Sequence, residues 1–145
     1  RALEWLRTER SDRRLAACLT LRELARNAPT TFYSKTNQSG YMGSNEFLDH
    51  IFPVLGDPQP IVRVCAADAL SECLKILVER HHRSTTGMLC QIYSNIMEGF
   101  HGPHRTKRRA SNHGHAADRV VQISETAQHG SLLIIGDMLD HTGDF

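Results

Sequence analysis

The chain has 145 residues, of which 40% are hydrophobic and 23% charged, and its formal net charge is +1. This is the composition of a globular domain rather than a disordered segment, and the length suffices for a hydrophobic core. The near-neutral charge argues against a broad nucleic-acid-binding surface, and no apolar run approaches the roughly 20 residues of a membrane span.

Apolar residues recur at helical spacing along most of the chain, whereas strand patterns are weak. The predicted helices, in chain order, cover residues 2–7, 12–28, 45–55, 61–78, 88–100 (opening near 84–86) and 125–141. Ser11 or Asp12 is the expected N-cap of the second helix, which ends before Pro29. Asp57 is the expected N-cap of the fourth helix, with Pro58 at its first position.

Two stretches interrupt the helical pattern. Residues 34–45 are polar and contain two glycines, which predicts a loop within or beside a helix. Residues 101–115 are basic, rich in histidine and lack apolar periodicity, which predicts an exposed insertion.

Three segments share one pattern: apolar, variable, acidic, apolar, apolar. They are Leu21–Ala25, Leu70–Leu74 and Ile135–Leu139, and their first residues are 49 and 65 positions apart. A two-helix unit of about 40–47 residues is typical of HEAT and armadillo repeats, and loop insertions lengthen it. The sequence therefore predicts an all-α solenoid of about three stacked antiparallel helix pairs, covering residues 1–28, 30–80 and 84–141. Such pairs form arrays because stacked neighbours share a continuous core.

The stretch from Asp57 to Arg63 is the most specific part of the repeat. Asp57, Pro58 and Arg63 resemble the HEAT signature, in which an acidic turn residue precedes a Val-Arg pair on the second helix. An Asp and an Arg placed in this way can tie one pair to the next by charge-assisted hydrogen bonds. The first pair retains Arg14 at the corresponding place, and the third has His129 there.

Several segments resemble one kinase family in the identity of their residues as well as in their apolar pattern. Residues 2–6, 14–25 and 27–32 are similar to the N-terminal HEAT region of the target-of-rapamycin protein kinases, and the similarity continues through 47–52, 57–58 and 129–135. The polar stretch 34–45 and the basic stretch 101–115 depart from what we expect of that family.

This resemblance implies a segment of a very large cytoplasmic serine/threonine kinase of the phosphatidylinositol-3-kinase-related group. It implies a non-catalytic scaffold that docks a regulatory subunit of the raptor kind in growth signalling, with association to endomembrane surfaces through the parent complex. The alternative is a HEAT-repeat scaffold of an unrelated protein, such as a transport receptor or a phosphatase subunit.

The segment itself is not expected to be an enzyme or to hold a cofactor. None of its ten glycines forms the G-x-G of a phosphate-binding loop. Histidines 101, 104, 113 and 115 are the tempting metal cluster, but they lie among Gly, Pro, Ser and Asn, and zinc needs ligands on firm turns. A solvated loop is the favoured interpretation, and no metal site is predicted.

The run Lys107–Arg109 lies just before Ser111, which makes Ser111 a candidate site for phosphorylation by a basophilic kinase. The same run is compatible with a nuclear-localisation fragment or a nucleic-acid contact, but it lacks interleaved aromatic residues. A solvated surface loop is the commonest role of such a run, and we expect protein partners rather than nucleic acid.

The four cysteines include no C-x-x-C pair and lie in apolar stretches. We expect them to be reduced thiols in a cytosolic or nuclear protein. Trp5 is expected to pack the first helix onto the second, with a role as a partner anchor as the alternative.

Overall fold

The computed structural model describes residues 2–36, 46–80, 83–101 and 124–141, and every regular element in these ranges is a helix. The helices are α1 (Ala2–Trp5), α2 (Ser11–Asn27), α3 (Pro29–Thr36), α4 (Glu46–Leu55), α5 (Pro60–Arg80), α6 (Arg83–His101) and α7 (Glu125–His141). The predicted all-α class is therefore confirmed. None of these helices is long and apolar enough to cross a membrane.

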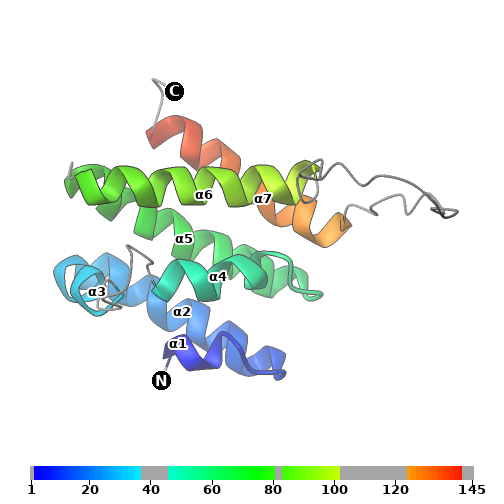
Figure 1. The fold of residues 1–145 in the computed structure, drawn as a ribbon. Coiled ribbons are helices and arrows are strands. Elements are labelled where there is room, and N and C mark those ends of the chain that lie inside the picture. The colour runs from blue at the N-terminus through cyan, green and yellow to red at the C-terminus, as the bar shows by residue number, and fades with distance from the viewer. Residues whose placement is uncertain (1, 37–45, 81–82, 102–123, 142–145) are drawn as a thin grey trace, which may run out of the picture.

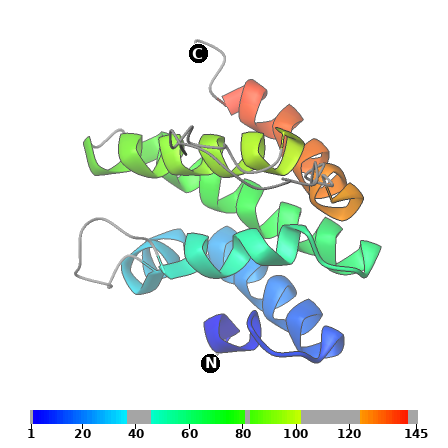
Figure 2. The ribbon, with the colours of Figure 1, turned by 45° about the vertical axis from the view of Figure 1, so that its right-hand side comes forward.

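All of these helices except α3 lie in two layers. In one layer α5 packs between α2 and α7, and in the other α1, α4 and α6 cover α2, α5 and α7 respectively. Figure 1 shows these groups at successive levels, from the N-terminus at the bottom to the C-terminus at the top. The turned view in Figure 2 keeps the same order, with α1 and α7 at opposite ends.

The core is centred on α5, which contacts α2, α4, α6 and α7. The sequence predicts a single apolar face for this helix, but the structure buries residues around most of its circumference, from Val62 to Leu77. A helix that packs against neighbours on most sides can be apolar over most of its surface. The small residues Ala66, Ala67 and Ala69 leave room for the surrounding helices.

The third helix is the element that the sequence did not predict. Residues 34–36, assigned to a loop, form its last turn. Pro29 begins this helix because its missing N–H is not needed at the first position. Phe32 of α3 packs edge-on against Phe47 of α4, with ring centroids 5.1 Å apart. The rest of the predicted loop, 37–45, lies outside the described residues.

Two predicted helix starts differ from the observed ones. The first residue of α5 is Pro60 rather than Pro58, although Asp57 does accept a backbone hydrogen bond from Gln59 N, at 2.9 Å. Helix α2 has Arg10 at its N-cap position, and that residue makes no side-chain cap hydrogen bond. Ser11 and Asp12 lie inside the helix, and the Asp12 carboxylate pairs with Arg10 at 2.7 Å.

Two glycines allow helices to approach closely. A Cβ at Gly130 in α7 would collide with the carbonyl oxygen of Leu55, at the end of α4. A Cβ at Gly99 in α6 would collide with Ser131 of α7, whose hydroxyl donates a hydrogen bond to Ile96 O at 2.9 Å. Gly130 and Gly99 therefore mark two close approaches, one between α7 and α4 and one between α6 and α7.

Candidate functional site: a polar ladder across three helices

Asp57 lies in the turn between α4 and α5, and its side chain is only 3% exposed. Its Oδ2 accepts a hydrogen bond from Arg14 Nε of α2 at 2.5 Å, and its Oδ1 accepts one from Gln59 N at 2.9 Å. A buried carboxylate requires such partners, because burial without them is costly. These two hydrogen bonds hold the turn in shape and join it to α2.

Arg63, in the first turns of α5, extends this connection toward α7. Its Nη1 donates to Asp57 O at 2.6 Å and to Pro58 O at 3.2 Å, while its Nε donates to His129 Nδ1 at 2.9 Å. His129 Nδ1 acts as the acceptor, so this geometry requires that nitrogen to carry no proton. The guanidinium of Arg63 therefore holds the turn and also contacts α7.

We call Arg14, Asp57, Arg63 and His129 the polar ladder, because they link α2, α5 and α7 in succession. Arg14 also donates from Nη1 to Thr8 O at 2.8 Å, which fixes the segment before α2. Among the described residues, no buried side-chain nitrogen or oxygen lacks a hydrogen-bond partner. Every buried polar side-chain atom of the polar ladder thus has a partner within the chain, an arrangement suited to holding helices together.

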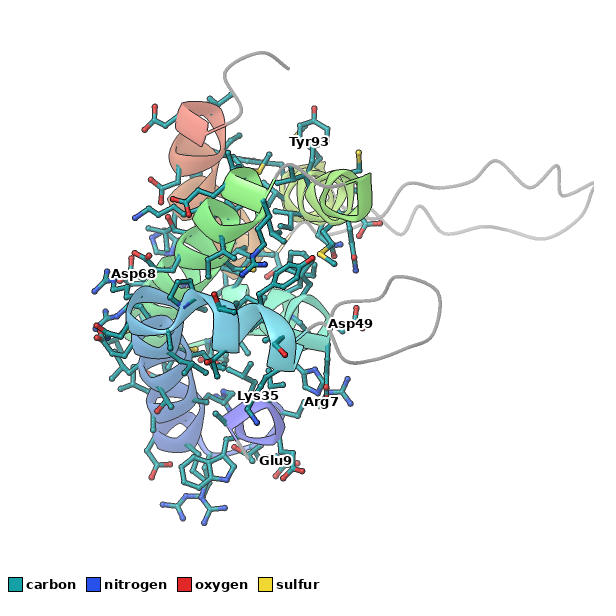
Figure 3. All side chains as sticks on the ribbon, turned by 90° about the vertical axis from the view of Figure 1, so that its left-hand side faces the viewer. Arg7, Glu9, Lys35, Asp49, Asp68 and Tyr93 are labelled. Atoms are coloured by element: carbon teal, nitrogen blue, oxygen red, sulfur yellow. The ribbon has the colours of Figure 1, made fainter. Side chains whose placement is uncertain are left out.

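A second row of charges joins α2 and α5 at the surface. Arg26 Nε donates to Glu72 at 3.0 Å, Lys75 Nζ contacts the same oxygen at 3.1 Å, and Arg22 lies 3.5 Å from Asp68. Burial by itself would raise the pKa of Glu72, but the hydrogen bonds from Arg26 and Lys75 outweigh it and lower that pKa. Figure 3 shows Asp68 on this side of the molecule and Asp49 of α4 on the opposite side.

The thiols of α2 and α5 are unsuited to nucleophilic chemistry. Burial, followed by the nearby Cys65 and Asp57, raises the pKa of Cys18 to about 12. Burial also raises the pKa of Cys73 to about 12 and that of Cys65 above its ordinary value. A thiol reacts as its thiolate, so these three groups are inert at neutral pH. Cys90, on α6, is exposed, and all four cysteines are free.

A hollow of about 540 Å³ lies beside the polar ladder, between α1, α4 and the turn that contains Asp57. Its charged lining includes Arg7, Glu9 and Arg14. Figure 3 shows Arg7 and Glu9 near the N-terminal end of the molecule. The described part of the chain holds no group of three or more His, Cys, Asp or Glu that could bind a metal ion.

The structure brings together the predicted signature residues Asp57, Pro58 and Arg63. It also adds Arg14 and His129 to the same network, as their places in the repeat suggested. His129 lies 66 residues after Arg63, one residue more than the spacing of the shared pattern. Thr8 was missed because it contributes a backbone oxygen, for which the sequence carries no signal.

Other predicted residues have different outcomes. Ser111 and the run 107–109 lie outside the described residues, as do three of the four clustered histidines, 104, 113 and 115. Of His101 the structure describes only its place at the end of α6. Trp5 is not a core residue: it is 39% exposed, and the guanidinium of Arg13 lies over its ring at 5.5 Å.

Comparison with known proteins gives whole-length similarity to a segment of much longer kinases. The chain is 33% identical over 99% of its length to "Serine/threonine-protein kinase TOR" of Arabidopsis thaliana, and 28% identical over its full length to "Serine/threonine-protein kinase tor1" of Schizosaccharomyces pombe. "Target of rapamycin homolog" of Caenorhabditis elegans is 33% identical over 63% of the chain. The chain spans about 5% of the first two relatives and 3% of the third.

No protein-family model matches the chain, and no solved structure does. The resemblance identified from the sequence is nevertheless confirmed by the named relatives, since each of them is a target-of-rapamycin protein.

Proposed function

We propose, from the premise that this chain is related over its whole length to a segment of the target-of-rapamycin kinases, that it is a non-catalytic scaffold segment within such a kinase. In this proposal the parent protein is a serine/threonine kinase whose ATP-binding and catalytic residues lie elsewhere. The observation that carries the proposal is the polar ladder, in which buried charged groups join successive helices.

The helices are proposed to form HEAT-type pairs. Helices α1 and α2, α4 and α5, and α6 and α7 correspond to the predicted units 1–28, 30–80 and 84–141, with α3 as an added helix of the second unit. Because residues 34–36 belong to α3, the first proposed insertion covers 37–45 rather than 34–45. The second proposed insertion remains 101–115. Support comes from the polar ladder, which connects the second helices of successive pairs near the same end.

The scaffold is further proposed to dock a protein partner of the parent complex, such as a raptor-like regulatory subunit. The parent is proposed to act in growth signalling in the cytoplasm, in part at endomembrane surfaces. Ser111, beside three cations, is proposed as a phosphorylation site that alters the contacts of its segment. The whole-length relationship to target-of-rapamycin kinases favours this function over the scaffold of an unrelated transport receptor or phosphatase subunit.

The test is affinity capture of the full-length protein, with and without residues 1–145, followed by identification of bound subunits and a kinase assay on a peptide substrate. Loss of a raptor-like subunit with kinase activity retained is the expected result. Retention of every subunit together with full activity would contradict the docking role and leave these helices as spacers. Loss of both subunit and activity would mean that the segment supports the fold of the whole protein, and docking would then be rejected as its specific role.

A further inference from the structure

Two hollows lie on either side of the place where α4 ends. The larger is the hollow of about 540 Å³ beside the polar ladder, and the smaller, of about 190 Å³, lies between α4, α6 and α7. Pro53 and Gly56 line both, so the two hollows are adjacent. We call the two hollows, with Pro53 and Gly56 between them, the turn groove. An extended peptide can lie over these two residues and reach both hollows, whereas a compact small molecule would fill only one.

His50 of α4 supplies an acceptor to the larger hollow. The residue is only 8% exposed and lines this hollow. Its Nδ1 lies 2.6 Å from Glu46 O, which can only accept, so Nδ1 carries the proton and Nε2 of the neutral ring is an acceptor. Nε2 has no partner among the described residues, where every fully buried side-chain nitrogen has one. Nε2 therefore faces accessible space, which suits a ligand that offers an N–H group.

Two arginines at the larger hollow retain free donors. Arg7 is exposed, and its guanidinium makes no hydrogen bond or ion pair with another described residue. Arg14 uses Nε for Asp57 and Nη1 for Thr8 O, which leaves its Nη2 without a partner in the described part of the chain. Free guanidinium N–H groups bind carboxylates well, because their planar geometry matches the two oxygens. The hollow thus offers donors for an acidic group.

The charges around the larger hollow favour a carboxylate over a phosphate. Its lining contains the two arginines together with Glu9 and Asp57, so its formal charge is zero while the histidine is neutral. Asp57 is paired with Arg14, whereas Glu9 is exposed and has no ion pair among the described residues. A single negative charge can pair with Arg7. A phosphate group, which carries roughly −1.5 to −2, would also be repelled by Glu9.

The smaller hollow is suited to an apolar side chain. Its polar side chains are already occupied, since Asn95 Nδ2 donates to Gln91 O at 3.0 Å and Ser131 Oγ donates to Ile96 O at 2.9 Å. The apolar residues of its walls include Phe52, Leu55, Ile96 and Ala127. An apolar cavity of about 150 Å³ accepts a benzene ring, so a hollow of about 190 Å³ has room for one Leu or Phe side chain.

We propose that the turn groove docks an extended segment of a protein partner, which carries an acidic residue and, across Pro53 and Gly56 from it, a large apolar residue. The carboxylate binds Arg7, with Arg14 Nη2 as a second donor. A peptide N–H of the segment donates to His50 Nε2, and the apolar side chain enters the smaller hollow. This inference rests on the proposed docking role and adds to it the surface and the chemistry of the partner segment.

The experiment exposes the immobilised full-length protein to a displayed library of random peptides. The enriched peptides are expected to share an acidic residue and a large apolar residue at a fixed separation. Selection on Arg7→Glu is expected to replace the acidic residue by Lys or Arg. The matched control is Arg13→Glu, because Arg13 is also exposed but does not line the groove, and it is expected to select the wild-type pattern.

The best synthetic peptide then reports on each contact through its Kd, measured by fluorescence anisotropy. Arg7→Glu is expected to weaken binding about tenfold or more, and Arg13→Glu to leave it unchanged. Ala127→Leu fills the smaller hollow and is expected to weaken binding as well. Methylation of the peptide's backbone nitrogens, one at a time, is expected to find a position that weakens binding to the wild type but not to His50→Phe.

Three results would each overturn the proposal: no shared acidic residue, equal effects of Arg7→Glu and Arg13→Glu, or tighter binding of a peptide with phosphoserine at the acidic position. Unchanged affinity in Ala127→Leu would overturn the role of the smaller hollow and with it the two-sided groove. If deletion of residues 1–145 releases no subunit while the peptide binds through Arg7, the docking of a raptor-like subunit fails and this inference stands. If deletion releases the subunit while the peptide binds Arg7→Glu equally well, the docking function stands and this inference fails.

Discussion

Asp57 is the residue on which most of the polar ladder depends. Its carboxylate is almost fully buried and binds Arg14, which is itself 16% exposed, while its main-chain oxygen binds Arg63. Removing one partner of a buried pair leaves the other charge uncompensated, which typically costs about 3–5 kcal/mol. The partial access of Arg14 to water moves the expectation toward the low end of this range.

Replacing Asp57 with Ala is therefore expected to lower the free energy of unfolding of the 145-residue chain by about 3 kcal/mol. Chemical denaturation measures this quantity. The control is Asp12→Ala, which removes an exposed carboxylate paired with Arg10 and is expected to cost less than about 1 kcal/mol. Equal losses for the two variants would refute the structural role assigned to Asp57.

The four cysteines should differ sharply in reactivity. Cys90 is exposed, whereas Cys18, Cys65 and Cys73 are buried and burial raises the pKa of each of these three. Brief treatment of the folded chain with a maleimide at neutral pH is expected to add one label, at Cys90, and treatment in denaturant is expected to add four. Rapid labelling of Cys18 or Cys73 in the folded chain would contradict their burial.

At the scale of the elements, the approach of α7 to the end of α4 depends on Gly130. Gly130→Ala would drive a Cβ into the backbone of Leu55, and such overpacking typically costs about 1–3 kcal/mol. The control is Gly136→Ala, where the chain leaves the space open, and there we expect stabilisation of about 0.5–1 kcal/mol. Denaturation midpoints of the two variants should therefore move in opposite directions.

The surface contact between α2 and α5 should depend on pH through Glu72. The pKa of Glu72 is lowered from its ordinary value of 4.5, so its contribution to stability is present above that value and is lost as the pH falls through the lower folded value. Glu72→Gln is therefore expected to reduce the loss of stability between about pH 5 and the acid limit, as measured by denaturation at several pH values.

At the scale of the whole molecule, the exposed Leu132 and Leu139 on the outer face of α7 predict that the 145-residue chain is only marginally stable alone. The stability of a helical repeat array is approximately a sum of repeat and interface terms, and a chain that lacks one interface lacks its contribution. We expect a broad, low-temperature unfolding transition by circular dichroism. Appending the polypeptide that follows in the full-length protein should sharpen the transition and raise its midpoint, and an unchanged midpoint would count against the missing interface.

The sequence by itself determined the helical class, the approximate limits of α2, α4, α5, α6 and α7, and the family resemblance. Helical periodicity is local, so the spacing of apolar residues such as Leu70, Cys73 and Leu74 is enough to reveal it. The signature residues Asp57 and Arg63 were recognisable for a similar reason, because their type and their separation carry the signal.

Only the tertiary structure decided which partners these residues take. The link from Arg63 to His129 spans 66 positions, and the spacing of residues along one helix does not show that these two side chains meet. The helix α3 escaped prediction because its burial rests on Phe32 packing against Phe47 across an intervening segment. The need for glycine at positions 99 and 130 likewise arises from the short distances between neighbouring helices. Contacts of this kind depend on how whole helices pack, a property that residue spacing along one helix does not encode.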